Sequence, residues 1–128
     1  MGEALWDSTP AGLFLGGAPL NVAIHLSRQG VDVELISSVG TDRLGEELLN
    51  RLQDEKVGVA FIKKEPQYET GFVTAEIGGN GDAHYTIVEN VAWDFLPVAP
   101  KKTPLPPRAI VYSSLGMRHS ESARKIDS

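Results

Sequence analysis

Residue types that bind hydroxyl groups stand close together near the start of the chain. Asp7 carries a carboxylate, and Asn21 carries an amide that both donates and accepts hydrogen bonds. Between them, Gly16 and Gly17 directly precede a predicted helix, and consecutive glycines let a ligand approach the backbone where side chains would clash. A carboxylate, an amide and open backbone around one crevice suit a polyol, which offers paired donors and acceptors.

Each of these residues also has a purely structural interpretation. Asp7 opens the sequence Asp-Ser-Thr-Pro and could stabilise a turn through its side chain. Asn21 could be a polar residue near a helix end, and a Gly-Gly pair before a helix is common. The residue types alone therefore leave both interpretations open.

Alternating strand and helix patterns dominate the first half of the chain and predict α/β layering. Helix is expected from Pro19 to a stop near Gly30, and again after Asp42, whose carboxylate can cap a leucine-striped segment. Strands are expected at residues 3–7, which end at a polar turn, and at the apolar segments Val33–Val39 and Val57–Ile62. Ligands in open α/β sheets bind at the carboxyl ends of such strands.

The second half begins with a hairpin pattern. Residues 68–77 and 84–88 are rich in β-branched and aromatic residues, and the glycine-rich residues 78–82 between them suit a turn. Residues 97–107 hold five prolines and are expected to form a non-helical linker. A last buried strand, Ala109–Tyr112, and the start of a helix near residue 120 follow.

Composition and charge exclude several classes of function. The chain has 128 residues, 41% hydrophobic and 23% charged, which suits one globular domain. The net charge is -5 without a basic stripe, so nucleic acid is not an expected partner. Cysteine is absent, which excludes disulfides and thiolate chemistry. No apolar run has membrane-spanning length and no signal-peptide pattern opens the chain, so no membrane partner and a cytoplasmic location are expected.

Three ordered motifs together resemble the opening of the PfkB carbohydrate kinases, closest to the fructokinase branch. They are residues 2–7 (Gly-Glu-Ala-Leu-Trp-Asp), 16–23 (Gly-Gly-Ala-Pro-Leu-Asn-Val-Ala) and 39–45 (Val-Gly-Thr-Asp-Arg-Leu-Gly). The resemblance implies a ribokinase-like α/β fold, here a partial doubly wound sheet with a small β-sheet lid around residues 8–15 and 68–90. It also implies that Asp7, Gly16, Gly17 and Asn21 contact sugar hydroxyls, whereas Asp42 and Gly45 are structural.

The family's second signature, Asp-Thr-x-Gly-Ala-Gly-Asp, does not occur in the 128 residues. Its last aspartate is the general base, so the resemblance implies that ATP and Mg²⁺ bind segments absent here and that no catalytic residue is present. Of the three histidines, none has metal-ligand spacing, and Trp6 and Trp93 are expected to pack.

Two hypotheses on function follow. The first is the truncated sugar-binding portion of an ATP-dependent sugar kinase, inactive alone, whose partners are a small sugar and either a second copy or a complementing C-terminal half. The alternative is a non-catalytic sugar-binding or oligomerising module.

Overall fold

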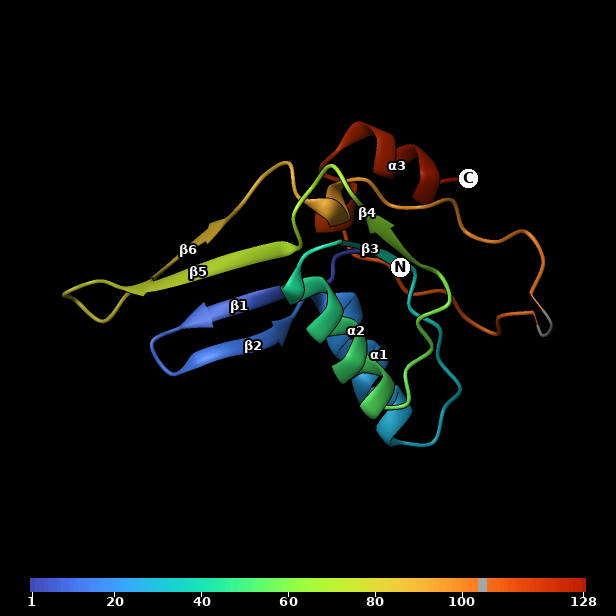
Figure 1. Ribbon diagram of the computed structural model, residues 1–128, viewed down its shortest axis with the longest axis horizontal. Coiled ribbons are helices and arrows are strands. Elements are labelled where there is room, and N and C mark those ends of the chain that lie inside the picture. The colour runs from blue at the N-terminus through green and yellow to red at the C-terminus, as the bar shows by residue number, and fades with distance from the viewer. Residues whose placement is uncertain (104–105) are drawn as a thin grey trace.

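A four-stranded mixed sheet projects as an arm from a body that carries the helices (Figure 1). The structure is a computed structural model that describes residues 1–103 and 106–128, without the side chains of residues 77 and 83. The sheet has the strand order β2-β1-β5-β6, and a separate parallel pair joins β3 to β4. The elements are β1 (Leu5–Thr9), β2 (Gly12–Gly16), α1 (Ala18–Arg28), β3 (Ser37–Gly40), α2 (Arg43–Asp54), β4 (Ile62–Glu65), β5 (Gly71–Ile77), β6 (Ala83–Ile87), α3 (Ser120–Ile126) and the short 3₁₀ helices η1 (Ala92–Asp94) and η2 (Leu115–Met117).

Strand β1 lies inside the sheet, antiparallel to β2 and parallel to β5. The strand expected over residues 3–7 is shifted by two residues, since it begins at Leu5 and ends at Thr9, and its turn falls at Pro10 and Ala11. Thr9 stabilises that turn, because its Oγ1 accepts from Ala11 N at 3.2 Å and lies 3.3 Å from the Gly12 carbonyl oxygen, to which it donates. Asp7 consequently stands in mid-strand, and the expectation that it ends the strand is wrong.

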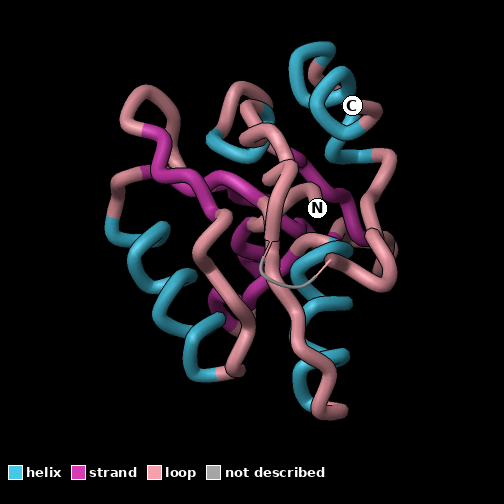
Figure 2. The backbone as a smooth tube through the Cα atoms, turned by 90° about the vertical axis from the view of Figure 1, so that its right-hand side faces the viewer, coloured by secondary structure: helices cyan, strands magenta, loops and turns pink. Residues whose placement is uncertain are grey.

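Helices α1 and α2 pack on one shared core. They overlap in Figure 1, but Figure 2 shows them apart, with strand and loop segments between them. The buried core side chains come from both helices and from the strands and loops: Ala4, Trp6, Leu20, Ala23, Ile24, Leu35, Val39, Leu48, Leu52 and Val57. Both predicted helices are confirmed, including the packing role of Trp6, whose Nε1 donates to the Leu44 carbonyl oxygen at 3.0 Å.

Asp42 caps α2, as the sequence predicts. Its Oδ1 accepts from Gly45 N at 2.7 Å and from Thr70 Oγ1 at 2.7 Å, and its Oδ2 accepts from Thr70 N at 2.7 Å. Thr70 Oγ1 also accepts from Gly40 N at 3.0 Å. Burial alone would raise the pKa of Asp42, but these hydrogen bonds to its charged form outweigh burial and lower that pKa. One carboxylate thus joins β3, α2 and the start of β5.

The parallel pair is shorter and later in sequence than predicted. Within Val33–Val39, regular pairing begins only at Ser37, because Gly2 N donates to the Ile36 carbonyl oxygen at 3.1 Å. Within Val57–Ile62, Gly58 forms an isolated parallel bridge with Glu34, and Ile62 pairs with Ser37 as the first residue of β4. Between them lies a turn in which Ile62 N donates to the Val59 carbonyl oxygen. Regular pairing is therefore confined to the C-terminal ends of both predicted strands.

The hairpin of β5 and β6 is confirmed, and its turn holds Gly81 at a φ of 83°. It extends the same sheet as the β1–β2 hairpin, so the segments expected to form a lid share one sheet. Of the predicted linker 97–107, residues 104–105 lie outside the described residues, and the rest contains neither helix nor strand.

Ala109–Tyr112 is not a buried strand. Ile110 is 68% exposed and Tyr112 is 57% exposed, and no strand pairs with this segment within the described residues. Its recorded backbone contact is a hydrogen bond from the Met1 amino group to the Val111 carbonyl oxygen at 2.6 Å. An apolar run predicts burial, but a strand also needs a neighbouring strand that binds its backbone groups.

Replacing Asp42 by Asn should lower the free energy of unfolding by about 1–3 kcal/mol at pH 7, because the amide has only one accepting oxygen, and its NH2 group cannot accept both from Thr70 N and from Gly45 N as the two carboxylate oxygens do. The pKa of Asp42 is lower in the fold than in the unfolded chain, where it is about 3.9. Its contribution is therefore complete above the unfolded value and lost as pH falls through the folded value.

Urea unfolding from pH 7 down to about pH 3 measures this difference. It should shrink as the pH falls below about 4, with the exposed Asp32→Asn as the control. A difference that stays constant over this pH range would contradict the assigned role of the carboxylate.

Candidate functional site

A cleft of about 390 Å³ opens where the arm meets the body, a volume within the range of roughly 300–1,000 Å³ that is typical of small-molecule sites. Its lining comes from three parts of the chain: residues 3–7 with strands β5 and β6, the start of α1, and the segment after residue 112. The lining residues are Glu3, Leu5, Asp7, Gly17, Ala18, Val73, Tyr85, Ile87, Ser113, Ser114 and Leu115.

Asp7 lies in a row of apolar side chains across the sheet. It pairs with Phe14 of β2 and Val73 of β5, and Val73 pairs with Ile87 of β6. Directly opposed residues point to the same face, so the carboxylate stands among apolar neighbours. Burial there raises the pKa of Asp7.

The Asp7 carboxylate makes no hydrogen bond and no ion pair with the described part of the chain. This excludes the interpretation of Asp7 as a turn residue, because a turn-stabilising aspartate would bond to the nearby backbone. An unpartnered carboxylate on the wall of a cleft can accept hydrogen bonds from the hydroxyl groups of a ligand.

Neighbouring atoms lie so close to the backbone at residues 16 and 17 that only glycine fits at both positions. A Cβ at Gly16 would collide with the Asp7 carboxylate and with the Leu5 side chain. Gly17 has a φ of 102°, and a Cβ there would collide with the Glu3 carbonyl oxygen. Gly17 is also the residue before α1, so the pair brings the helix N-terminus against the first strand.

The structure brings Asp7, Gly16 and Gly17 together, but it does not bring Asn21 into the lining of the cleft. Asn21 is exposed in the first turns of α1, where its backbone N donates to the Gly17 carbonyl oxygen at 2.9 Å. Its side chain has no hydrogen-bond partner within the described residues. The amide therefore stands near the helix end, outside the cleft wall.

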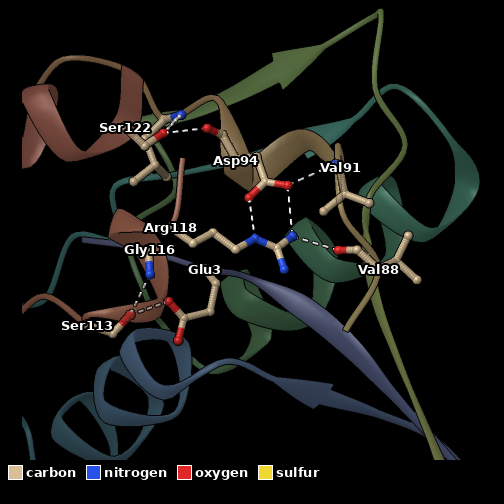
Figure 3. Close-up of polar contacts among 9 residues, drawn as sticks. Glu3, Val88, Val91, Asp94, Ser113, Gly116, Arg118 and Ser122 are labelled. Carbon is tan, nitrogen blue, oxygen red and sulfur yellow. Dashed lines mark hydrogen bonds and ion pairs between the residues drawn. The ribbon is translucent and has the colours of Figure 1, made fainter. Parts of the chain in front are cut away.

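Glu3 is a cleft residue that the sequence analysis missed. It is 2% exposed; its Oε1 accepts from Ala18 N at 3.2 Å and its Oε2 accepts from Ser113 Oγ, which in turn accepts from Gly116 N at 3.1 Å (Figure 3). Glu3 thus binds the start of α1 to the segment around residue 113. The two-residue period of a strand could have identified it, since residues 3, 5 and 7 share one face.

No group of three or more His, Cys, Asp or Glu side chains in residues 1–103 and 106–128 could hold a metal ion. The sequence also has no glycine-rich anion loop at a helix start that ends in an aspartate positioned as a base. The residues present therefore do not fit ATP or Mg²⁺, and no phosphoryl-transfer step can be built from them. Among the described residues, no helix combines the length and apolar character needed to cross a bilayer.

The arrangement is an open cleft at the junction of a β-sheet arm and an α/β body, with an unpartnered carboxylate on its wall. The profile of the pfkB family of carbohydrate kinases matches residues 11–114, and the chain belongs to this family. A protein of Pyrococcus horikoshii described as an uncharacterized sugar kinase is 40% identical over 78 residues, and a fructokinase of Salmonella typhimurium is 32% identical over 93 residues. The matches cover 61% and 69% of this chain, which spans only 25% and 30% of those relatives.

Solved structures show the same fold. The Pyrococcus horikoshii sugar kinase aligns with a TM-score of 0.66 at 36% identity, over 73% of this chain and 35% of that one. The fructokinase of Vibrio cholerae, in its apo form, aligns with a TM-score of 0.68 at 27% identity, over 76% and 35%. A second structure of the Pyrococcus protein is a complex with ATP. The predicted ribokinase-like α/β fold is therefore confirmed.

Replacing Asp7 by Asn should stabilise the protein at neutral pH. Because burial raises the pKa of Asp7 in the fold, ionisation of this group opposes folding. The favourable contribution is complete below the unfolded pKa of about 3.9 and is lost as pH rises through the higher folded value. The neutral amide does not suffer this loss.

Thermal unfolding should therefore give the Asp7→Asn variant a higher midpoint than the parent at pH 7 and a similar midpoint near pH 4. Asp54→Asn, at an exposed position on α2, is the control and should change neither. A lower midpoint for Asp7→Asn at pH 7 would show that the carboxylate has a stabilising partner.

Proposed function

We propose that this chain is the sugar-recognition portion of an ATP-dependent carbohydrate kinase, with a fructose-like sugar as its ligand. Membership of the pfkB family and the similarity to fructokinases support this proposal. The observation that carries it is the Asp7 carboxylate, held over Gly16 on the wall of the cleft and left without a partner. The cytoplasmic location stays a prediction from the sequence.

Each predicted site residue has a distinct part in the proposed recognition. Asp7 accepts hydrogen bonds from two neighbouring sugar hydroxyls, since a carboxylate has lone pairs on both oxygens. Gly16 and Gly17 leave room for the sugar beside the backbone, and Asn21, which is exposed on α1 outside the cleft wall, is proposed to bond a hydroxyl group of the sugar that extends beyond the cleft. The arm strands around residues 8–15 and 68–90 are proposed to act as the lid over the bound sugar.

Phosphoryl transfer is assigned to segments that the 128 residues do not contain. The sequence holds neither the Gly-Ala-Gly-Asp loop nor a cluster of metal ligands among its described residues. We therefore expect the chain alone to bind sugar without phosphorylating it, and ATP with Mg²⁺ to act only with a complementing C-terminal half. Loss of a general base and an anion-binding loop lowers a rate by about a thousandfold or more.

Calorimetric titration of the chain with fructose tests the proposal. Asp7→Ala and Asn21→Ala should each weaken binding by about 1–3 kcal/mol, because each removes one partner of a hydrogen bond to the ligand. Asp54→Ala and Asn50→Ala remove the same chemical groups from exposed positions on α2 and should leave the affinity unchanged.

A second titration in the presence of ATP and Mg²⁺ should give the same affinity and no fructose phosphate. Undiminished affinity in both site variants would contradict the assigned site. Fructose phosphate formed by the purified chain would contradict the assignment of catalysis to other segments.

A second candidate, an oligomerising module, is favoured by apolar side chains at both edges of the arm. Phe14 of β2 is 51% exposed and Tyr85 of β6 is 69% exposed, and β2 and β6 are the edge strands. Open strand edges with apolar residues tend to pair with other strands. We propose that a second copy covers this surface in a symmetric dimer.

Light scattering across a dilution series should give the mass of a dimer at high concentration and a fall towards the monomer on dilution. Phe14→Ser, which leaves the backbone pairing of β2 in place, should shift this fall to higher concentration. A single folded monomer at every concentration would contradict the second candidate and leave the sugar-binding proposal intact.

A further inference from the structure

Arg118 connects the end of strand β6 to the body of the protein. Its Nε donates to Asp94 Oδ1 at 2.6 Å and its Nη2 donates to Asp94 Oδ2 at 2.8 Å, a two-pronged ion pair (Figure 3). The same Nη2 also donates to the Val88 carbonyl oxygen at 2.6 Å. Such paired charge-assisted bonds fix direction as well as distance, because the guanidinium group is planar.

The Asp94 side of this contact is held firmly. Asp94 is 2% exposed, and its Oδ2 also accepts from Val91 N at 3.2 Å. Ser122 Oγ of α3 donates to the Asp94 carbonyl oxygen at 2.5 Å and accepts from Leu96 N at 3.0 Å. Helix α3 and the segment around η1 therefore fix the carboxylate that Arg118 binds.

The indole of Trp93 packs against the ion pair of Arg118 and Asp94, and we call these three side chains the anchor. Trp93 is 1% exposed, and the guanidinium carbon of Arg118 lies 4.0 Å from its ring centroid, a distance at which the cation attracts the ring. A Cβ at Gly71, the first residue of β5, would collide with the same indole. The anchor thus packs against the root of the arm.

The Val88 side of the contact is held by fewer bonds. Strand β6 is an edge strand that pairs only with β5, and Val88 follows its last residue. Val88 N donates to the Phe72 carbonyl oxygen at 3.3 Å, a long hydrogen bond. Two residues of β6, Tyr85 and Ile87, line the cleft. The bond from Arg118 therefore fixes the end of the strand that carries one cleft wall.

We propose that Arg118 is a positioning residue, which holds the end of β6 so that Ile87 and Tyr85 stay on the cleft wall, on the same face of the sheet as the Asp7 carboxylate. The part of this proposal that concerns the ligand rests on the proposed function, since it takes the cleft as the sugar site. The part that concerns β6 rests only on the contacts of Arg118, and it can be tested without any sugar.

Amide hydrogen exchange of the full 128-residue chain tests the effect on β6. Arg118→Lys retains a positive charge for Asp94, but a single ammonium group cannot reproduce both the fork and the bond to Val88. Exchange in residues 84–91 should become about tenfold faster or more, whereas exchange in α1 and α2 stays unchanged. Asp94→Asn, which weakens the same fork from its other end, should have the same local effect.

The matched control is Arg28→Lys. Arg28 makes the same two-pronged ion pair, with Glu55, at 2.7 and 2.5 Å, on the surface between α1 and the end of α2. This control should leave exchange in residues 84–91 unchanged. Unchanged exchange in residues 84–91 of Arg118→Lys would overturn the proposal, because Arg118 would then not hold the end of β6. An equal increase in every element would overturn it as well, because Arg118 would then affect only the global stability of the fold.

Fructose affinity provides the second measurement. Arg118→Lys should weaken binding by about tenfold, whereas Arg28→Lys should leave it unchanged. Faster local exchange with undiminished affinity would overturn the link between β6 and the cleft. Faster local exchange in a chain whose parent form binds no fructose would confirm the positioning of β6 and contradict the proposed function instead.

Discussion

Strand β1 places its side chains alternately on two faces, and both the core and the cleft depend on this alternation. Trp6 of β1, with Ala4 just before the strand, is buried in the core shared by α1 and α2, whereas Leu5 and Asp7 of β1, with Glu3 before the strand, line the cleft. The strand keeps this register because it is paired on both sides, with β2 and with β5. A shift of one residue would exchange the two sets, moving a carboxylate into the core and an indole into the cleft.

Strand β1 and the residues just before it show how two carboxylates four residues apart acquire different roles. Glu3 is fully engaged, since the start of α1 and Ser113 occupy its two oxygens. Asp7 has no partner, and its surroundings favour its neutral form. One acid is thus part of the scaffold, and the other retains unused hydrogen-bonding capacity. Natural sites commonly combine a stable frame with such a locally unfavourable group.

The sequence predicted the features that local patterns determine. The leucine stripe and cap of α2 and the glycine turn of the β5–β6 hairpin each depend on neighbouring residues, and the structure confirms both. The sequence pattern failed where contacts with distant segments decide. Regular pairing within Val33–Val39 begins only at Ser37, next to the Ile36 carbonyl oxygen that accepts from Gly2 N, and no strand lies beside Ala109–Tyr112 among the described residues.

The candidate site divides in the same way. Asp7 and the glycine pair lie together because a short hairpin links them. The residue types left two interpretations of them open, and the resemblance to a family of kinases supplied the prediction that they form one cluster. The contact of Glu3 with Ser113 joins residues far apart in the chain, and no local pattern indicates it. The side chain of Asn21 lies outside the cleft because its turn of α1 leaves it exposed, which depends on how the helix packs.

The parallel pairing of β1 with β5 also affects how the chain folds during synthesis. Leu5 pairs with Gly71, so the β1–β2 hairpin is made long before the strand that covers its inner edge. At about 5–20 residues per second, a ribosome needs several seconds to produce the residues between them. During that interval the early hairpin exposes the unpaired edge of β1, which makes the nascent chain a candidate for chaperone binding.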